Sequence, residues 1–385
     1  MRAGDALVEL PDAVREAVLA PLVDHHCHAV RRDDLTRARF ETLITEAGAP
    51  APPGATHFDT PAGLAVRRWC APVLDLDPHV PPAVYLARRA ELGAAEVNRR
   101  LLCEAGIVAF LVDTGLNGPE LLSTAEMGRL GGAAADEIVR IEQVERDVAA
   151  SAVSGVSYIV DLNDGLAAMA ARAVGLTSVI AYRNGLDFDP ARPSRGAVIA
   201  AANRRLADPE ESLCDPVLLR HLLWAAVDVA RDRNLPLQFH TGYGAPGLDP
   251  HRTDPALMTG FIRATQPIGV PVVLLHCHPF HRQAAYLAAT FPHVYVDVGF
   301  APAHTAAEAA TVVGRLLNLV PFHKQLFGSD GHGVAETCHL SALQYRRGLA
   351  GALAVRLAAG EWSVSDAVRV AHMIGSGNAR RIYHL

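Results

Sequence analysis

The chain has 385 residues, of which 50% are hydrophobic and 20% are charged, and its formal net charge is −6 at pH 7. This composition excludes disordered, collagen-like and coiled-coil proteins, and a chain of this length can bury a large core. The mildly acidic charge predicts no surface for nucleic acid or for an anionic membrane. The expected partner is a small-molecule substrate, with a homodimer as the default assembly.

The sequence also bears on the cellular location. The six cysteines form no C-x-x-C pair, which favours reduced thiols. Residues 1–20 mix acidic and apolar side chains without the apolar stretch of a signal peptide, and no apolar run is long enough for a transmembrane helix. We therefore expect a cytoplasmic protein.

Short apolar segments alternate with helical patterns along the chain. The predicted strands are residues 21–26, 107–113, 138–141, 178–182, 236–240, 271–276, 294–298 and 325–329, and clear helical patterns include residues 216–233 and 303–319. Eight strand–helix units favour an α/β fold of the (β/α)8 TIM-like barrel type. No G-x-G-x-x-G follows the first strand, which argues against a dinucleotide-binding sheet.

The connection between the first two predicted strands is unusually long. A plain barrel needs about 250 residues, and much of the surplus falls in residues 29–106, which contain a proline-rich turn and a predicted charged helix at 82–103. We interpret residues 1–385 as one barrel domain and residues 29–106 as a partly helical cap inserted after the first strand. A separate small domain is the alternative for this segment.

The strongest local motif is D-H-H-C-H at residues 24–28. Side chains two apart on a strand face the same side, so Asp24, His26 and His28 should share one face. His25 and Cys27 should then face the outer helices as packed residues. Two imidazoles at this spacing can chelate one cation, although an isolated H-x-H is more often a packing feature.

Three further strands end on a residue of the kind that binds metals. His240 ends the fifth predicted strand, His276 ends the sixth, and Asp330 directly follows the eighth. In a (β/α)8 barrel the carboxyl ends of the strands converge on one mouth, where the active site lies. The sequence therefore predicts a metal site at this mouth.

These motifs together resemble the amidohydrolase superfamily. The similarity is closest to its amidohydrolase 2 branch, which includes the amidohydrolase-like N-terminal domain of nodulin/glutamine-synthetase-like fusion proteins. It covers most of residues 20–350 and is densest over residues 236–346. The segments that carry it are DHHCH, AYRNGL, FHTGYG, LLHCHPFHRQAAYLA with FPHVYVDV, and FGSDGH.

The resemblance implies one or two divalent metal ions at the mouth of a distorted barrel. By position, His26, His28, His240 and Asp330 would be the ligands, and His276 would be either a ligand or the imidazole that handles protons. Three histidines and a carboxylate suit Zn²⁺, with Mn²⁺ or Fe²⁺ as alternatives.

The number of metal ions follows from a missing residue type. Many members of the superfamily bridge two metals with a carboxylated lysine on the fourth strand. Lys324 is the single lysine of this chain, and it precedes the eighth predicted strand, at the opposite end of the barrel. We therefore expect one ion rather than a lysine-bridged pair.

Arg183 and Tyr182 are the candidate substrate-binding residues. Arg183 ends the fourth predicted strand, and no other basic residue closes a predicted strand. A guanidinium can hold a carboxylate in a bidentate pair, so Arg183 is either a clamp for a substrate carboxylate or a structural brace. Glu336 would either orient a ligand imidazole or begin a helix. His278 would either support a ligand residue or, as we favour, lie on the surface beyond the strand end.

The leading functional hypothesis is a metal-dependent amidohydrolase acting on an amide or related C–N bond. Asp330 would take a proton from the attacking water and return it to the leaving group, while His276 or the metal polarises the scissile carbonyl. The main alternative is a metal-dependent non-oxidative decarboxylase of a small carboxylic acid, which needs the same ligands. The third hypothesis is a non-catalytic barrel. Such a barrel should have lost metal ligands, whereas all five candidate positions carry a ligand residue here.

Overall fold

The computed structural model describes residues 10–209, 212–244, 246–299 and 301–385. The first nine residues of the N-terminal stretch considered above lie outside the described residues. Eight parallel strands pair in the order in which they occur in the chain. They are β1 Leu22–His28, β2 Ile107–Asp113, β3 Ala134–Arg140, β4 Gly175–Ser178, β5 Leu237–His240, β6 Val272–Leu275, β7 Val294–Asp297 and β8 Gln325–Leu326.

The two ends of this sheet meet beside β1. The amide of His25 donates to the carbonyl of Phe327 (3.1 Å), Asp330 N donates to His26 O (3.0 Å), and His28 N donates to Gly331 O (2.8 Å). These bonds join β1 to the end of β8 and to the loop after it. The predicted (β/α)8 barrel is therefore confirmed.

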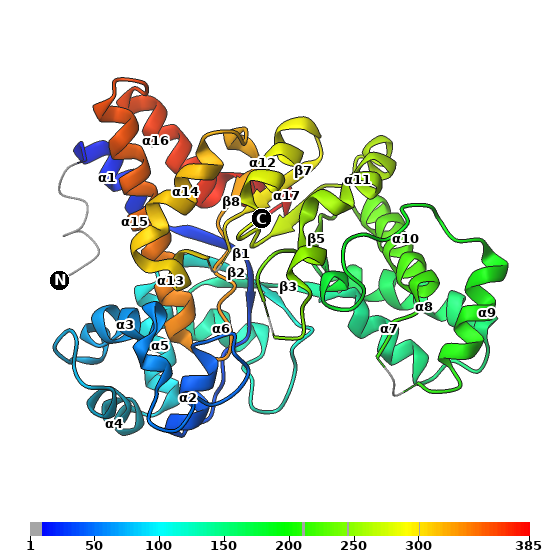
Figure 1. Ribbon diagram of the computed structural model, residues 1–385, viewed down its shortest axis with the longest axis horizontal. Coiled ribbons are helices and arrows are strands. Elements are labelled where there is room, and N and C mark those ends of the chain that lie inside the picture. Colours follow the sequence, from blue (N-terminus) through cyan, green and yellow to red (C-terminus); the bar gives the residue numbers. More distant parts are fainter. Residues whose placement is uncertain (1–9, 210–211, 245, 300) are drawn as a thin grey trace.

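Helices surround the strands, with α2–α5 gathered on one side and α8–α10 on the other (Figure 1). Their bounds are α1 Asp12–Leu19, α2 Arg37–Leu43, α3 Pro61–Ala65, α4 Pro82–Leu92, α5 Ala94–Glu104, α6 Thr124–Gly131, α7 Ile141–Ala149, α8 Gly155–Ala170, α9 Arg195–Arg205, α10 Pro216–Arg233, α11 Thr259–Thr265, α12 His281–Thr290, α13 Ala301–Thr305, α14 Ala309–Leu317, α15 Ala335–Ala358, α16 Val364–His372 and α17 Asn378–Ile382.

The bounds of α10 agree with the sequence prediction because its end signals are strong. The Asp215 side chain accepts hydrogen bonds from the amides of Val217 and Leu218, and Pro216 occupies the first turn. At the other end Asn234 adopts the left-handed conformation, with φ of 55°. Such a carboxylate cap and a left-handed terminal residue are typical helix boundaries.

Three predicted elements were wrong in extent. The helix expected at 82–103 is two helices, because Gly93 between α4 and α5 has φ of +75°, which glycine adopts easily. The helix expected at 303–319 is divided between α13 and α14. The strand expected at 178–182 is β4, which ends at Ser178 and is followed by a 3₁₀ turn, Ile180–Tyr182.

β4 ends early because side chains capture its next amides. Glu142 accepts hydrogen bonds from the Ser178 hydroxyl (2.6 Å) and from Val179 N (3.0 Å). Ser178 Oγ in turn accepts from Ile180 N at 3.2 Å. These amides are no longer available to a neighbouring strand, so the chain turns at this point.

The bottom of the barrel interior is filled from the C-terminal part of the chain. Ala379, Ile382 and Tyr383 belong to one buried cluster with inward residues of the strands, such as Val23 and Leu111. Because α17 closes this end of the barrel, it positions the Tyr383 hydroxyl among the strands.

The cap segment, residues 29–106, contains α2–α5 and is tied to the barrel by a buried ion pair. Glu336, in the first turn of α15, accepts hydrogen bonds from Arg89 Nε (2.9 Å) and the Tyr85 hydroxyl (2.8 Å), both on α4. The exposed fractions of the Arg89 and Glu336 side chains are 6% and 0%. Glu336 therefore begins a helix and anchors the cap, and it does not contact a candidate metal ligand.

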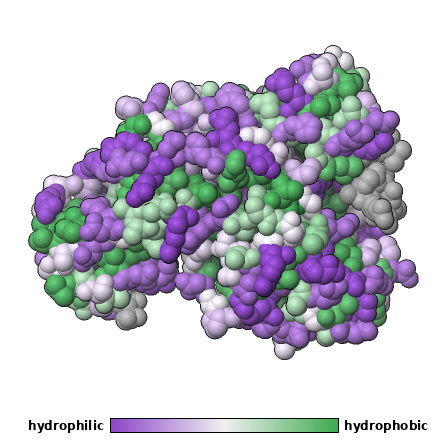
Figure 2. All heavy atoms as spheres, turned by 180° about the vertical axis from the view of Figure 1, so that it is seen from behind, coloured by the Kyte–Doolittle hydropathy of each residue, from purple (hydrophilic) through white to green (hydrophobic). Residues whose placement is uncertain are grey.

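None of the helices in the described part of the chain is long and apolar enough to cross a membrane. Figure 2 shows that hydrophilic and hydrophobic residues are interspersed over the face it presents.

We predict that Arg89→Ala destabilises the protein by about 3–5 kcal/mol, because it leaves the Glu336 carboxylate buried without its cation. Chemical denaturation should measure this loss. The double variant Arg89→Met/Glu336→Gln removes both charges and should recover part of it. Equal stability of wild type and Arg89→Ala would show that the ion pair does not anchor the cap.

Candidate metal centre

Four imidazoles from three strand ends meet at the barrel mouth. The ring centroid of His26 lies 5.1 Å from that of His28, 4.9 Å from that of His240 and 5.7 Å from that of His276. His276 Nε2 lies 3.1 Å from His240 Nδ1. The structure therefore brings the four predicted histidines together.

Asp330 lies on the other side of this group. Its Oδ1 is 3.4 Å from His28 Nε2 and 3.6 Å from His26 Nε2, and its Oδ2 is 3.7 Å from His276 Nε2. The residue follows β8 by four positions and has φ of +50°. All the predicted ligand positions thus share one site.

The first strand reaches the site in a way that strict alternation did not predict. The pairing of β1 with β2 shifts register between Asp24 and Cys27. His25 therefore points into the barrel, where its Nδ1 lies 3.0 Å from the Tyr383 hydroxyl, and does not face the outer helices. Asp24 instead accepts hydrogen bonds from the amide and hydroxyl of Ser329, so it does not join His26 on the ligand face.

Sequence reasoning missed a buried carboxylate. Asp113, at the end of β2, has no exposed surface, and its Oδ2 lies 3.7 Å from both His28 Nδ1 and His240 Nε2. It accepts hydrogen bonds from Arg140 at the end of β3, with Nη2 at 2.5 Å. The sequence could have pointed to this pair, because Asp113 and Arg140 each end a strand. The prediction that Arg183 is the only basic residue at a strand end was therefore wrong, because Arg140 ends β3.

The donor set fits a metal ion. His26 Nε2, His240 Nε2, His28 Nδ1 and Asp330 Oδ1 are buried and have no hydrogen-bond partner among the described residues. Two groups can each bring one ligand atom per residue within 4.8 Å of one another: His26 with His240 and His276, and His26 with His28 and Asp113. Buried polar atoms without partners are costly, so a cation that binds them would stabilise the site.

The protonation states also suit a cation. Burial lowers the pKa of His26 well below its usual value, helped by His240 and His28, and lowers the pKa of His240 to about 4. Burial alone would raise the pKa of Asp113, but Arg140 and the histidines hold it well below the usual range. The histidines around Asp330 likewise outweigh burial and keep its pKa low. His28 is the exception, because burial alone would lower its pKa but Asp330 and Asp113 raise it. Neutral imidazoles and ionised carboxylates are the forms that bind metals, so a cation would compete with a proton at His28.

A polar network below the site orients the ligands. Gln238 Oε1 accepts from His26 Nδ1 at 2.8 Å, while Gln238 Nε2 donates to the Tyr383 hydroxyl at 2.8 Å. This fixes the proton of His26 on Nδ1 and leaves Nε2 facing the site. Asp297 bonds His25 Nε2 (2.7 Å) with one oxygen and the His276 amide (2.6 Å) with the other.

A hollow of about 330 Å³ opens above the potential ligands. Tyr182 and Arg183 both line it, and the Tyr182 hydroxyl lies 3.4 Å from His240 Nδ1. Arg183 follows the 3₁₀ turn rather than ending β4, and its side chain is exposed. Its guanidinium has no hydrogen bond or ion pair with any residue that the structure describes.

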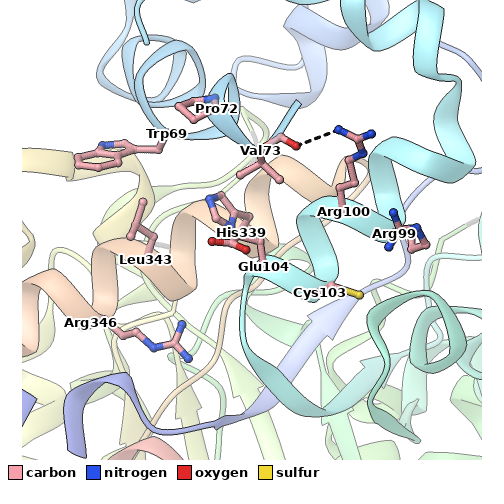
Figure 3. Close-up of a pocket in the computed structure, with 10 residues that line it drawn as sticks. All are labelled: Trp69, Pro72, Val73, Arg99, Arg100, Cys103, Glu104, His339, Leu343 and Arg346. Atoms are coloured by element: carbon pink, nitrogen blue, oxygen red, sulfur yellow. Dashed lines mark hydrogen bonds between the residues drawn. The ribbon is translucent and has the colours of Figure 1, made fainter. Parts of the chain in front are cut away.

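A larger hollow lies elsewhere. It measures about 590 Å³ and is lined by Trp69 and Val73 of the cap, by α5 and by His339 and Arg346 of α15 (Figure 3). None of its lining residues belongs to the candidate metal groups. The size of a hollow therefore does not identify the candidate site. The convergence of potential metal ligands identifies it.

The remaining residues considered from the sequence lie outside the ligand group. Lys324 is buried before β8 and donates to the carbonyls of Ala288 and Phe291, so it does not reach the mouth. The ring of His278 stacks on His281, with centroids 5.4 Å apart. Cys27 and Cys277 are buried free thiols, as expected.

Comparison with known proteins finds similarity to hydrolases. A family model described as Amidohydrolase matches residues 200–385. A proposed metal-dependent hydrolase from Lactobacillus casei has a solved structure that superimposes with a TM-score of 0.85 and 25% identity, over 95% of both chains. These matches support the amidohydrolase superfamily for this chain. Its similarity is to the amidohydrolase 2 branch, as the sequence motifs implied.

Two other relatives define the limits of this comparison. Protein fluG of Emericella nidulans is 27% identical to this chain over 404 aligned residues, which cover 95% of the chain but 46% of fluG. The chain thus spans about half the length of the curated relative it matches. The structure of the uronate isomerase of Thermotoga maritima superimposes with a TM-score of 0.66 over 98% of both chains. At 11% sequence identity, this similarity shows the fold alone.

We predict that the purified protein carries about one tightly bound divalent ion per chain, as expected for a histidine-rich site of this kind. His26→Ala and His240→Ala should each lose it, as measured by elemental analysis. His339→Ala, at the separate hollow, is the matched control and should retain the ion. No metal in the wild type, even after incubation with Zn²⁺, would contradict the assignment, and two ions would contradict the expected stoichiometry.

Proposed function

We propose that this protein hydrolyses an amide or related C–N bond of a small, carboxylate-bearing substrate in a metal-dependent reaction. The observation that carries the proposal is the group of buried imidazole and carboxylate atoms without partners beneath the hollow of about 330 Å³. The similarity to the Lactobacillus casei protein supports the reaction class. We further propose Zn²⁺ as the cofactor, held by His26, His28, His240 and Asp330.

The bound ion would supply Lewis acidity and a water whose pKa is lowered towards about 7. Asp330 is suited to move the proton by its position, because its carboxylate is ionised and lies 3.4 to 3.7 Å from the His28, His26 and His276 nitrogens. In the proposed reaction, water adds its oxygen to the amide carbon and gives one proton to Asp330. Asp330 passes that proton to the leaving nitrogen as the C–N bond breaks, which yields a carboxylic acid and an amine.

Two further residues have proposed roles. His276 is held by the bond from its amide to Asp297, so its ring has a fixed place beside His240 and Asp330. From there it can polarise the substrate carbonyl or bind the ion. Arg183 lines the hollow with an exposed guanidinium that can pair with a substrate carboxylate. Tyr182 lines the same hollow, and its hydroxyl lies 3.4 Å from His240 Nδ1.

The reaction class can be tested on a panel of small amides and small carboxylic acids, with detection of amine release and of carbon dioxide release. We expect amine release from at least one carboxylate-bearing amide and its loss on removal of the metal by a chelator. Carbon dioxide release without amine release would contradict hydrolysis and support the decarboxylase alternative.

We predict that His276→Asn retains the fold and most of the metal but lowers turnover by about 10²–10⁴, because general acid–base assistance is worth this much. Turnover and metal content should be measured on the same preparation. Parallel loss of metal would show that His276 is a ligand, and unchanged turnover would contradict any role in the reaction.

We predict that Arg183→Lys lowers kcat/KM for an acidic substrate, and that Arg183→Met lowers it further, without loss of metal. Lysine retains the charge but loses the bidentate geometry. Arg129→Met, on the exposed side of α6, serves as the control. A large fall in melting temperature with unchanged kcat/KM would show that Arg183 is a structural brace.

A further inference from the structure

Glu46 places a carboxylate from the cap segment at the mouth of the barrel. It lines the hollow of about 330 Å³ above the potential ligands and also an adjoining hollow of about 360 Å³. Its side chain is 19% exposed. Glu46 and Tyr243 are shared by the linings of both hollows, so this carboxylate stands where the two meet.

No residue of the described structure neutralises this carboxylate with a hydrogen bond. The nearest ionisable nitrogen is Nε2 of His332, 3.8 Å from Glu46 Oε1, which is too long for a hydrogen bond. Burial chiefly raises the pKa of Tyr182, and the charge of Glu46 contributes to this rise. Because Tyr182 contacts His240, the charge of Glu46 acts on the site itself.

The adjoining hollow offers Glu46 no cation. It is lined by hydroxyl groups, including those of Thr45, Thr60 and Thr305. Burial lowers the pKa of His304 to about 4, and burial also lowers the pKa of His278, so both imidazoles are neutral near pH 7. Glu46 is therefore the only formal charge among the residues that line this second hollow.

The hollow above the ligands also has the opposite charge on its wall. Arg183 lines it with a guanidinium that is paired with no carboxylate of the described residues, whereas Arg140 is already bound to Asp113. Apart from the proposed ligand Asp330, the pocket thus presents one carboxylate, Glu46, whose nearest ionisable nitrogen is 3.8 Å away, and one guanidinium, Arg183, that has no ion pair among the described residues. A ligand with the complementary pair of charges would form two charge-assisted hydrogen bonds there.

We propose that the substrate carries both a protonated amine, which Glu46 binds, and a carboxylate, which Arg183 binds. The inference rests on the proposed function, because it takes the amide-hydrolysing site as the place where these charges are recognised. The substrate class is then an amide with amino-acid-like charges, such as a dipeptide or the side-chain amide of an amino acid. Glu46 is a specificity-determining residue and takes no part in proton transfer.

Binding of amino acids to the metal-loaded protein tests the inference without turnover. The probes are 4-aminobutyrate, 5-aminopentanoate and 6-aminohexanoate, whose two charges lie too far apart to chelate a metal as α-amino acids do. Each is compared by calorimetry with the acid and the amine of the same chain length. We expect at least one amino acid to bind at least about tenfold more tightly than either analogue.

Variants should separate the contributions of Glu46 and Arg183 to binding. Glu46→Gln should abolish the preference for that amino acid over the carboxylic acid, and Arg183→Met should abolish its preference over the amine. Glu91→Gln, an exposed acid of the cap, should change neither preference. Equal binding of the singly charged analogues, no binding of any amino acid, or a preference that survives Glu46→Gln would overturn the inference.

Failure of the proposed function would look different. If the amino acids bind with the expected dependence on Glu46 but no amide in the panel is hydrolysed, recognition of both charges stands and the assigned reaction fails. If amides are hydrolysed equally well after their amines are acetylated, the reaction stands and the role of Glu46 fails.

Discussion

The site depends on how the barrel closes. Backbone hydrogen bonds from His28 to Gly331 and from Asp330 to His26 join the first strand to the loop after the last one. The residues that make these bonds also supply three of the proposed ligands. Closure of the barrel and assembly of the metal centre are therefore one structural event, and an error in register between β1 and the last loop would separate the ligands.

The carboxylates and the arginine beneath the mouth show how this protein tolerates buried charge. Asp113 is fully buried, yet Arg140 and the nearby histidines hold its pKa well below the usual range. Of the two imidazoles beside it, burial lowers the pKa of His240, whereas at His28 burial is outweighed by Asp330 and Asp113, which raise the pKa. Because an unpaired buried carboxylate is costly, the ion pair makes it possible for negative charge to lie next to the ligand nitrogens. The Asp113–Arg140 pair thus contributes to the electrostatic potential at the place where a cation would bind.

Much of the site could be predicted because parallel strands share one direction. Once His26, His240 and His276 were assigned to strand ends, the barrel required them to meet. Asp113 and Arg140 were missed although they carry the same signal, since a single aspartate or arginine at a strand end has many structural explanations. The sequence motif also did not reveal the register shift in β1, which depends on its pairing with β2. Likewise, β4 ends at Ser178 because of contacts from Glu142, 36 residues earlier in the chain.

The helix that closes the bottom of the barrel has a consequence for biosynthesis. Tyr383 follows every strand in chain order, yet its hydroxyl accepts the hydrogen bond that orients Gln238 towards His26. During synthesis from the N-terminus, the first ligand strand is therefore made long before this tyrosine. Until residue 383 has emerged, the Gln238 amide that bonds His26 is held by the His25 carbonyl without the Tyr383 hydroxyl, so the full set of bonds that orients His26 is completed only after all eight strands have been made.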